Sequence, residues 1–320
     1  MSPEAEFVDH PSGFLALSPR NIRFAPAGHR GFIAYRKYGH TRFLFGGVHA
    51  PAEERGALLD LFLAAAQRHG CGVVAVQVRR EQCELFAARG FTVNSFGQTF
   101  AARLDGFSLA GASRVKLRNK IKRARAAGLV VQEVGRELPR DEQTFARLRA
   151  VSAAWLREKG KPELEFMIGE LGEVAETRRR FFVASDSQGN MRGFISYVPA
   201  WGARPGYLHD LTRRTPDAPP GTMELINAEA IARLRGEGVE YLHLGFTPFI
   251  VAGPEPAGAS KVVGTVLRLL GRHGRRIYPA QSQIDYKHKW GPDIVEDEML
   301  AFRPLSPRAV LDLLKVTRSL

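Results

Sequence analysis

The chain has 320 residues, a hydrophobic content of 44% and a formal net charge of +13. This length suits two domains with ordinary cores, and no apolar run reaches the roughly 18 to 20 residues of a membrane-spanning helix. The amino terminus lacks the basic start and apolar stretch of a signal peptide, so we expect a cytoplasmic protein. The positive charge favours polyanionic partners, although a solvated arginine-rich surface is the alternative.

Hydrophobic periodicity predicts alternating strands and helices in the first half of the chain. Period-two alternation indicates paired strands within residues 30–48, and helical spacing indicates a helix over 52–69. The rest of this half is predicted as a strand over 72–78, a helix over 80–90 and extended structure over 91–104.

The second half repeats this pattern. Residues 136–180 read as helical, and two strands follow within 180–201. The later elements are a segment from 206 that opens as a short β-like run, a helix from 222 to 235 and a strand over 240–246. Because each half has a hairpin, a helix and then a strand headed by Gly-Val, we infer a duplicated α/β unit.

The two cysteines, Cys71 and Cys83, lack any metal-ligand spacing and adjoin apolar segments. We expect two buried thiols, with a disulfide or a nucleophile as the alternative.

An acid-free helix is predicted over residues 113–128, with Leu117, Ile121 and Ala124 as a narrow apolar stripe. Like charges four residues apart on a helix are unfavourable, so this density of cations points to an external polyanion, either RNA or lipid headgroups. Chance enrichment in an arginine-rich chain is the alternative. The cations are Arg114, Lys116, Arg118, Lys120, Lys122, Arg123 and Arg125.

A second acid-free stretch begins at Lys261 and contains the amphipathic segment 262–270. It predicts either a helix that lies on a membrane surface or a packed helix with a basic edge, and the packed helix is favoured.

The pattern Arg233-Leu-Arg-Gly236-Glu-Gly238 matches the R-x-x-G-x-G sequence with which acetyltransferases hold acetyl-CoA. That function needs the glycines at a helix amino terminus, where backbone N–H groups meet phosphate. Here they follow a helix, so a helix stop is the favoured interpretation.

The segment 206–225, "GYLHDLTRRTPDAPPGTMEL", combines charge with a rigid backbone. Asp210 and Arg213 follow a strand, prolines frame the loop, and Glu224 enters the next helix. A surface ion pair of Asp210 with Arg213 and a carboxylate that satisfies the helix dipole at Glu224 are the structural alternatives, and Asp217 reads as a turn former.

Four segments together resemble one family. They are "DLTRRTPDAPPGTMEL…EGVEYLHLGFTPF", "FSLAGASRVKLRNKIKRARAAG", "GGVHAPAEERGALLDLF" and "DYKHKWGPDIVEDEMLAF". This set is similar to the motifs of the phosphatidylglycerol lysyltransferase C-terminal family, the tRNA-dependent aminoacyltransferases of lipid headgroups. The resemblance covers roughly residues 30–303.

The resemblance implies an α/β (α+β) fold of tandem GNAT-like domains, with mixed, mainly antiparallel sheets flanked by helices. The domains are then 1–107, a basic linking helix at 108–135, and a catalytic unit at 136–320. The resemblance also implies catalytic roles for Asp210, Arg213, Glu224 and Lys289, and substrate binding by Tyr286, Lys287, Gly245 and Met223. The seven cations of the basic helix would bind tRNA phosphates.

The donor implied is aminoacyl-tRNA, and the acceptor is an anionic lipid or a soluble small molecule, without a cofactor or metal. Asp210 would orient the donor or accept a proton, and Arg213 or Lys289 would bind phosphate or the oxyanion. We expect this Asp/Arg pair and the basic helix to face one cavity. Peripheral contact with the inner face of the membrane is left open.

Two acidic positions of the family are replaced here by Val48 and Gln98, which leaves the transferred amino acid open. Two other functions remain as alternatives. The first is a non-catalytic GNAT-like protein that binds RNA or anionic membranes, and the second is an acetyl-CoA-dependent N-acetyltransferase.

Overall fold

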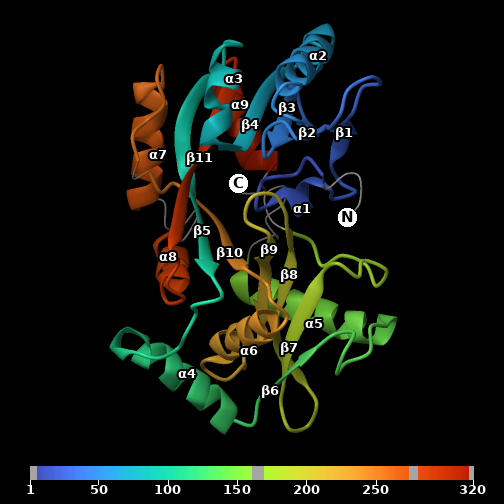
Figure 1. The fold of residues 1–320 in the computed structure, drawn as a ribbon, viewed down its shortest axis with the longest axis vertical. Coiled ribbons are helices and arrows are strands. Elements are labelled where there is room, and N and C mark those ends of the chain that lie inside the picture. The colour runs from blue at the N-terminus through green and yellow to red at the C-terminus, as the bar shows by residue number, and fades with distance from the viewer. Residues whose placement is uncertain (1–5, 161–168, 252, 274–279, 317–320) are drawn as a thin grey trace.

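A computed structural model describes residues 6–160, 169–251, 253–273 and 280–316. Its strands form one mixed sheet in the order β1-β2-β3-β4-β11-β5-β10-β9-β8-β7-β6 (Figure 1). They are β1 (Ile22–Phe24), β2 (Ile33–Tyr38), β3 (Thr41–Phe45), β4 (Gly72–Arg79), β5 (Thr92–Arg103), β6 (Val130–Glu133), β7 (Arg180–Ser185), β8 (Met191–Ala200), β9 (Gly206–Arg214), β10 (Tyr241–Pro248) and β11 (Ile294–Arg303).

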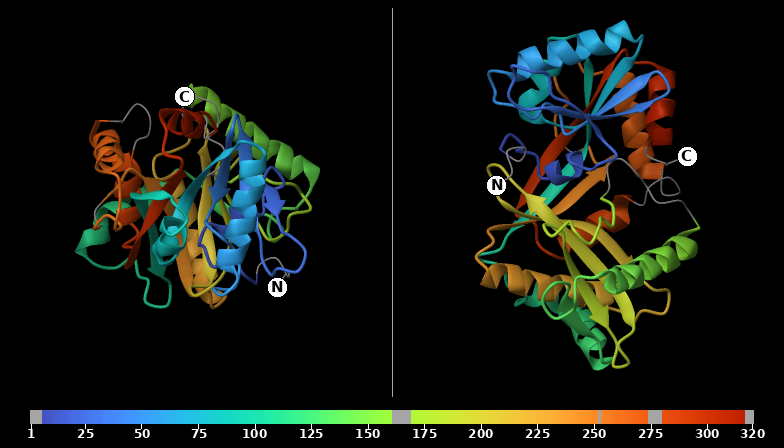
Figure 2. Two further views of the ribbon diagram at one scale, coloured as in Figure 1. Left: turned by 90° about the horizontal axis from the view of Figure 1, so that it is seen from above. Right: turned by 90° about the vertical axis from the view of Figure 1, so that its right-hand side faces the viewer.

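The helices pack on both faces of this sheet (Figure 2). They are α1 (Gly13–Ala16), α2 (Arg55–Arg68), α3 (Cys83–Ala87), α4 (Val115–Ala126), α5 (Glu142–Lys159), α6 (Thr222–Gly236), α7 (Lys261–His273), α8 (Ala280–His288) and α9 (Pro307–Val316), with short 3-10 turns at Arg80–Gln82 and Ala112–Arg114. The predicted fold class is therefore confirmed, and most predicted elements lie within a few residues of their expected bounds.

The sheet contains the predicted duplication. In each half an antiparallel group ends in a parallel pair, β3 with β4 and β9 with β10. The neighbour of each parallel pair comes from the other half of the chain. β11 pairs with β4, and β5 pairs with β10. Because β11 and β5 also pair with each other, the halves meet along a continuous seam.

This exchange bears on the predicted domain bounds, which otherwise stay a prediction. The unit proposed at 136–320 contains β11, yet β11 completes the sheet of the amino-terminal half. Residues 136–180 were expected to be helical. Within the described part of that range, α5 ends at Lys159 and residues 169–179 form no helix. The strand β6 was not predicted, because it lies within residues 108–135, which were expected to form the linking helix.

Adjacent residues of the strands enter different cores, as alternation requires. In the carboxy-terminal half, Phe182 packs towards α4 and α6, whereas Phe181 packs towards α5. In the amino-terminal half, α2 and α3 cover one face and α1, α7 and α9 cover the other. The helices α4 and α6 thus lie on the face of the carboxy-terminal half opposite to α5 (Figure 1).

Candidate active site

The predicted catalytic residues lie on both faces of the sheet, and Asp210 lies at an irregularity of β9. Ile195 of β8 opposes Thr212, but Tyr197 opposes His209, so β9 has one extra residue at Asp210-Leu211. Such a bulge interrupts the alternation of side chains. His209 therefore faces α6, whereas Asp210 points towards the α5 face.

Asp210 is held by a buried ion pair. Arg179 donates to its carboxylate, and the two side chains are 6% and 3% exposed. The backbone N–H of Gly169 donates to Oδ1 at 2.9 Å. A buried carboxylate with these partners fastens the segment that precedes β7 to β9.

Arg213 lies on the α5 face as well. Its guanidinium stacks on the Trp155 ring of α5 at 4.2 Å from the centroid. The carboxylate of Asp210 pairs with Arg179, so the alternative interpretation of Asp210 and Arg213 as a surface ion pair is not the contact seen. Since α4 packs on the opposite face, the prediction that the Asp/Arg pair and the basic helix share a cavity is wrong.

The face that carries α6 gathers the other predicted residues. Glu224, in the first turn of α6, accepts from Lys120 Nζ at 2.9 Å and Lys289 Nζ at 3.4 Å. Burial alone would raise the pKa of Glu224, but Lys120 and the charge of Lys289 lower it below its usual value. The Glu224 carboxylate thus binds two cations from different parts of the chain, Lys120 and Lys289.

Close contact between α4 and α6 makes this cluster possible. Gly221, just before α6, has φ of +92°, and a Cβ there would lie 2.1 Å from the carbonyl oxygen of Lys120. Met223 packs in the same core, with its Cε against Gly193. Met223 is therefore placed as a packing residue beside the cluster.

Lys287, near the end of α8, lies on the same face, and Lys120, Glu224, Lys287 and Lys289 are together called the α6-face cluster. It is 4% exposed, and its Nζ donates to the Gly245 carbonyl at 2.6 Å and to Thr247 Oγ1 at 2.7 Å. Burial lowers the pKa of Lys287 to about 7, against a smaller opposite effect of Glu298. Gly245 can present its carbonyl because φ is +78° at an irregularity of β10, a conformation suited to glycine.

Aromatic rings lie between the contacts of Glu224 and those of Lys287. The Tyr286 ring is 5.9 Å from His209 and 6.2 Å from Trp290, and Lys289 lies 5.4 Å from its centroid. His209 bonds to Thr212 Oγ1 at 2.7 Å. Burial, together with the charge of Lys287, lowers the pKa of His209 to about 3, so the imidazole is neutral near pH 7.

Two buried groups, Glu298 and His10, were not predicted from the sequence. Glu298 of β11 is 1% exposed and lies 3.2 Å from His10 Nε2. Neither carboxylate oxygen has a hydrogen-bond partner among the described residues. Only the pairing of β11 with β4 and β5 brings this carboxylate near Lys287, so no local pattern could have revealed it.

The basic helix α4 keeps fewer free cations than predicted. Lys120 and Arg125 pair with Glu224 and Glu229 of α6. Arg114 and Arg118 donate to carbonyls of the preceding loop at Ser108, Leu109 and Gly111. Within the described part of the chain, Lys116, Lys122 and Arg123 are exposed and have no such contact.

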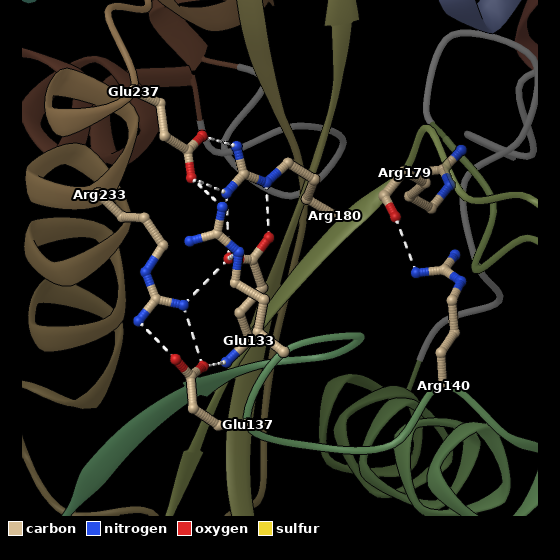
Figure 3. A network of polar contacts seen from close by, with 8 residues as sticks. Glu133, Glu137, Arg140, Arg179, Arg180, Arg233 and Glu237 are labelled. Atoms are coloured by element: carbon tan, nitrogen blue, oxygen red, sulfur yellow. Dashed lines mark hydrogen bonds and ion pairs between the residues drawn. The ribbon is translucent and has the colours of Figure 1, made fainter.

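Arg233 is bound within a network of ion pairs shown in Figure 3. It donates to Glu133 at 3.0 Å and to Glu137 at 2.9 Å, while Arg180 joins Glu133 to Glu237. The carboxylates of Glu133 and Glu237 raise the pKa of Arg180 in spite of its burial. Because Arg233 is engaged and α6 ends at Gly236, this pattern is a helix terminus rather than a pyrophosphate site.

Both cysteines are free, with Cys83 buried and Cys71 partly exposed. Over residues 6–160, 169–251, 253–273 and 280–316, no group of acidic, histidine or cysteine side chains is arranged to hold a metal ion. In the same ranges every helix is too short or too polar to cross a bilayer.

The sequence profile described as phosphatidylglycerol lysyltransferase, C-terminal, matches residues 4–302. The chain belongs to this family. The match includes both halves of the sheet and every residue of the α6-face cluster, so the family assignment made from four short motifs is confirmed.

Curated relatives and solved structures are consistent with the assignment of this chain to the lysyltransferase family. The chain is 27% identical over 257 residues to the lysylphosphatidylglycerol biosynthesis bifunctional protein LysX of Mycobacterium tuberculosis, a match that covers 80% of this chain and 21% of LysX. The chain thus spans about a fifth of the length of the curated relatives it matches.

Two crystal structures share the fold. The C-terminal domain of a putative lysylphosphatidylglycerol synthetase from Agrobacterium fabrum superposes with a TM-score of 0.77 at 23% identity, covering 97% of this chain and 92% of that one. L-PGS from Bacillus licheniformis gives 0.75 at 21% identity, with coverages of 97% and 93%. These two structures therefore have the same overall fold as this chain.

Proposed function

We propose that this chain is an aminoacyltransferase that moves an amino acid from aminoacyl-tRNA to the headgroup of a phosphatidylglycerol-type lipid. The observation that carries the proposal is the family match over residues 4–302. It is supported by the names of the relatives, which describe lysylphosphatidylglycerol biosynthesis. The α6-face cluster supplies groups suited to this chemistry.

Lys287 is proposed as the proton carrier. The donor is already an activated ester, so the protein must position both substrates and move one proton. With a pKa of about 7, the neutral amine of Lys287 can accept the proton of the acceptor hydroxyl as its oxygen bonds to the ester carbon. The resulting ammonium then returns this proton to the ribose oxygen as the ester bond to tRNA breaks.

The surrounding residues are proposed to place the substrates. Lys289, 36% exposed and fixed on Glu224, is suited to bind a phosphate of either substrate. Lys116, Lys122 and Arg123 offer exposed charge for the tRNA backbone, which requires no reading of sequence. Asp210 and Arg213 are proposed to hold β9 in register beside the cluster.

The identity of the transferred amino acid stays open, because two acidic positions of the family are replaced in this chain. Val48 is buried in the apolar core under α2, and Gln98 donates to Asp297 at 2.9 Å. Neither side chain adds negative charge for a cationic amino acid.

The test combines the purified protein with a pool of charged tRNAs and vesicles containing phosphatidylglycerol, and detects new lipids by mass spectrometry. We expect an aminoacylated lipid, and we expect Lys287→Met to abolish it. The matched control Lys37→Met, at an exposed position of β2, should retain transfer. Salt-sensitive binding of uncharged RNA with no transfer from any tRNA would instead identify a binding protein.

A further inference from the structure

The helix α7 is fixed to the molecule by one face. Leu267 is 6% exposed and belongs to the core that contains Phe96 of β5 and Leu300 of β11, against which Val263 and Phe249 also pack. Gly271 lies so close to the Phe249 carbonyl that a Cβ would be 2.3 Å from its oxygen. The predicted packed helix is therefore present, and its inward face is buried against the core.

The outward face of α7 is apolar as well. Val262, Val266 and Leu269 are 74%, 46% and 51% exposed. Their spacing of four and three residues places them in one stripe along the helix. They are three of the ten large hydrophobic residues exposed in the described part of the chain, whereas exposed apolar residues on a soluble protein are usually scattered singly.

A basic stripe runs beside the apolar one. Lys261, Arg268 and Arg272 are exposed and share a helix side at spacings of seven and four residues. Glu255 approaches Arg268 at 3.6 Å, and the Arg268 side chain is still 47% exposed. A helix that places exposed aliphatic side chains next to lysine and arginine matches the interface of an anionic bilayer, where tails and phosphates adjoin.

We propose that α7 docks this protein on an anionic membrane surface. Val262, Val266 and Leu269 enter the boundary of the acyl chains, and Lys261, Arg268 and Arg272 lie among the lipid phosphates. The charge selects this occupant over a second copy of the chain, since two copies would bring these cations together. Figure 1 shows α7 and α8 along the same edge of the molecule, so docking brings the lipid beside the helix that carries Lys287.

This surface deepens the proposed function, because it rests on a lipid acceptor, but it can be tested without catalysis. The experiment measures co-sedimentation of the full chain with vesicles of phosphatidylglycerol and phosphatidylcholine, and with phosphatidylcholine vesicles alone. The test variant changes Val262, Val266 and Leu269 to serine, which leaves net charge unaltered. The control changes Ile22, Leu61 and Val130 to serine, which are 49%, 40% and 61% exposed on other elements.

We expect the wild type and the control to bind the anionic vesicles, and the α7 variant to bind at least tenfold more weakly. A second variant, Lys261→Gln, Arg268→Gln and Arg272→Gln, should also weaken binding and flatten its salt dependence. Circular dichroism establishes that the variants are folded. Equal binding by the α7 variant and the wild type would overturn the proposal, as would a dimer that dissociates in the variant while vesicle binding is unchanged.

Transfer to a short-chain, monomeric phosphatidylglycerol separates docking from catalysis. The α7 variant should retain this transfer and lose transfer to vesicles. A wild type that binds vesicles through α7 and transfers to neither acceptor would refute the proposed function and support the docking surface.

Discussion

At the scale of single residues, burial decides what each charged side chain can do. Asp210 and Lys287 are both buried, but Asp210 has a guanidinium as its partner, whereas Lys287 is held by neutral oxygens. A buried cation whose hydrogen bonds go only to neutral oxygens loses part of its preference for the proton. Lys287 is thereby suited to proton transfer near neutral pH.

The low pKa of Lys287 predicts a pH dependence of stability. Its folded pKa of about 7 lies below the value of 10.5 for an unperturbed lysine, so the unfolded chain binds more protons between these two values. The free energy of unfolding should then rise with pH across this window, by up to about 1.4 kcal/mol per pH unit from this group. Urea denaturation from pH 7 to pH 10 should show this increment in the wild type and in Lys37→Met, but not in Lys287→Met. An identical slope in all three would show that Lys287 titrates normally.

At the scale of elements, local periodicity predicted correctly which face of a helix is buried, but not which distant residues contact it. Leu117, Ile121 and Ala124 form the buried stripe of α4 as expected. The counter-charges of the same helix were missed, because Glu224 and Glu229 lie about a hundred residues away on α6. The bulge at Asp210 was also missed, since strict alternation along β9 gives no sign of an extra residue.

The stripe of α4 gives a stability prediction with a control in the same helix. Leu117 is 3% exposed, so Leu117→Ala should lower the free energy of unfolding by about 2–4 kcal/mol through lost burial and a cavity. Val115 is 41% exposed, and Val115→Ala should change it by less than about 0.5 kcal/mol. Chemical denaturation measures both, and similar losses would mean that α4 is not docked as described.

The exposed cations of α4 give a prediction for tRNA binding. Replacing Lys116, Lys122 and Arg123 by glutamine should weaken binding and reduce the slope of log affinity against log salt by about 2–3, because each of the three phosphate contacts contributes about 0.7–0.9. The control replaces Lys37, Arg68 and Lys315 by glutamine. These residues are exposed on other elements, and their replacement removes the same amount of charge. Fluorescence anisotropy with labelled tRNA would show equal slopes for the two variants if α4 does not contact the backbone.

At the scale of the whole molecule, the seam between the halves governs folding. Residues 1–107 contain β5 but neither β10 nor β11, its two partners. Expressed alone, this segment should show no cooperative unfolding transition by circular dichroism, whereas the full chain should unfold in one transition seen by every probe. A cooperative transition for 1–107 would establish it as an independent domain, as the sequence-based bounds suggest.

The strand exchange also marks where prediction from sequence stopped. Repetition of hairpin, helix and strand was visible from pattern alone, because each pattern is local. Which strand completes which half depends on contacts between residues about two hundred positions apart, such as Met299 with Ser95. Single-sequence periodicity does not record such pairings, so the electrostatic effect of Glu298 on Lys287 could be learned only from the structure.

The same crossing has a consequence for how such a chain can change over time. Since each repeat lends the other the strand that closes its sheet, neither copy can be deleted or replaced by an unrelated module without leaving an open edge in what remains. Inheritance must therefore carry the two copies as a unit, and new specificity has to arise in helices and loops that project from the shared sheet, as α7 does.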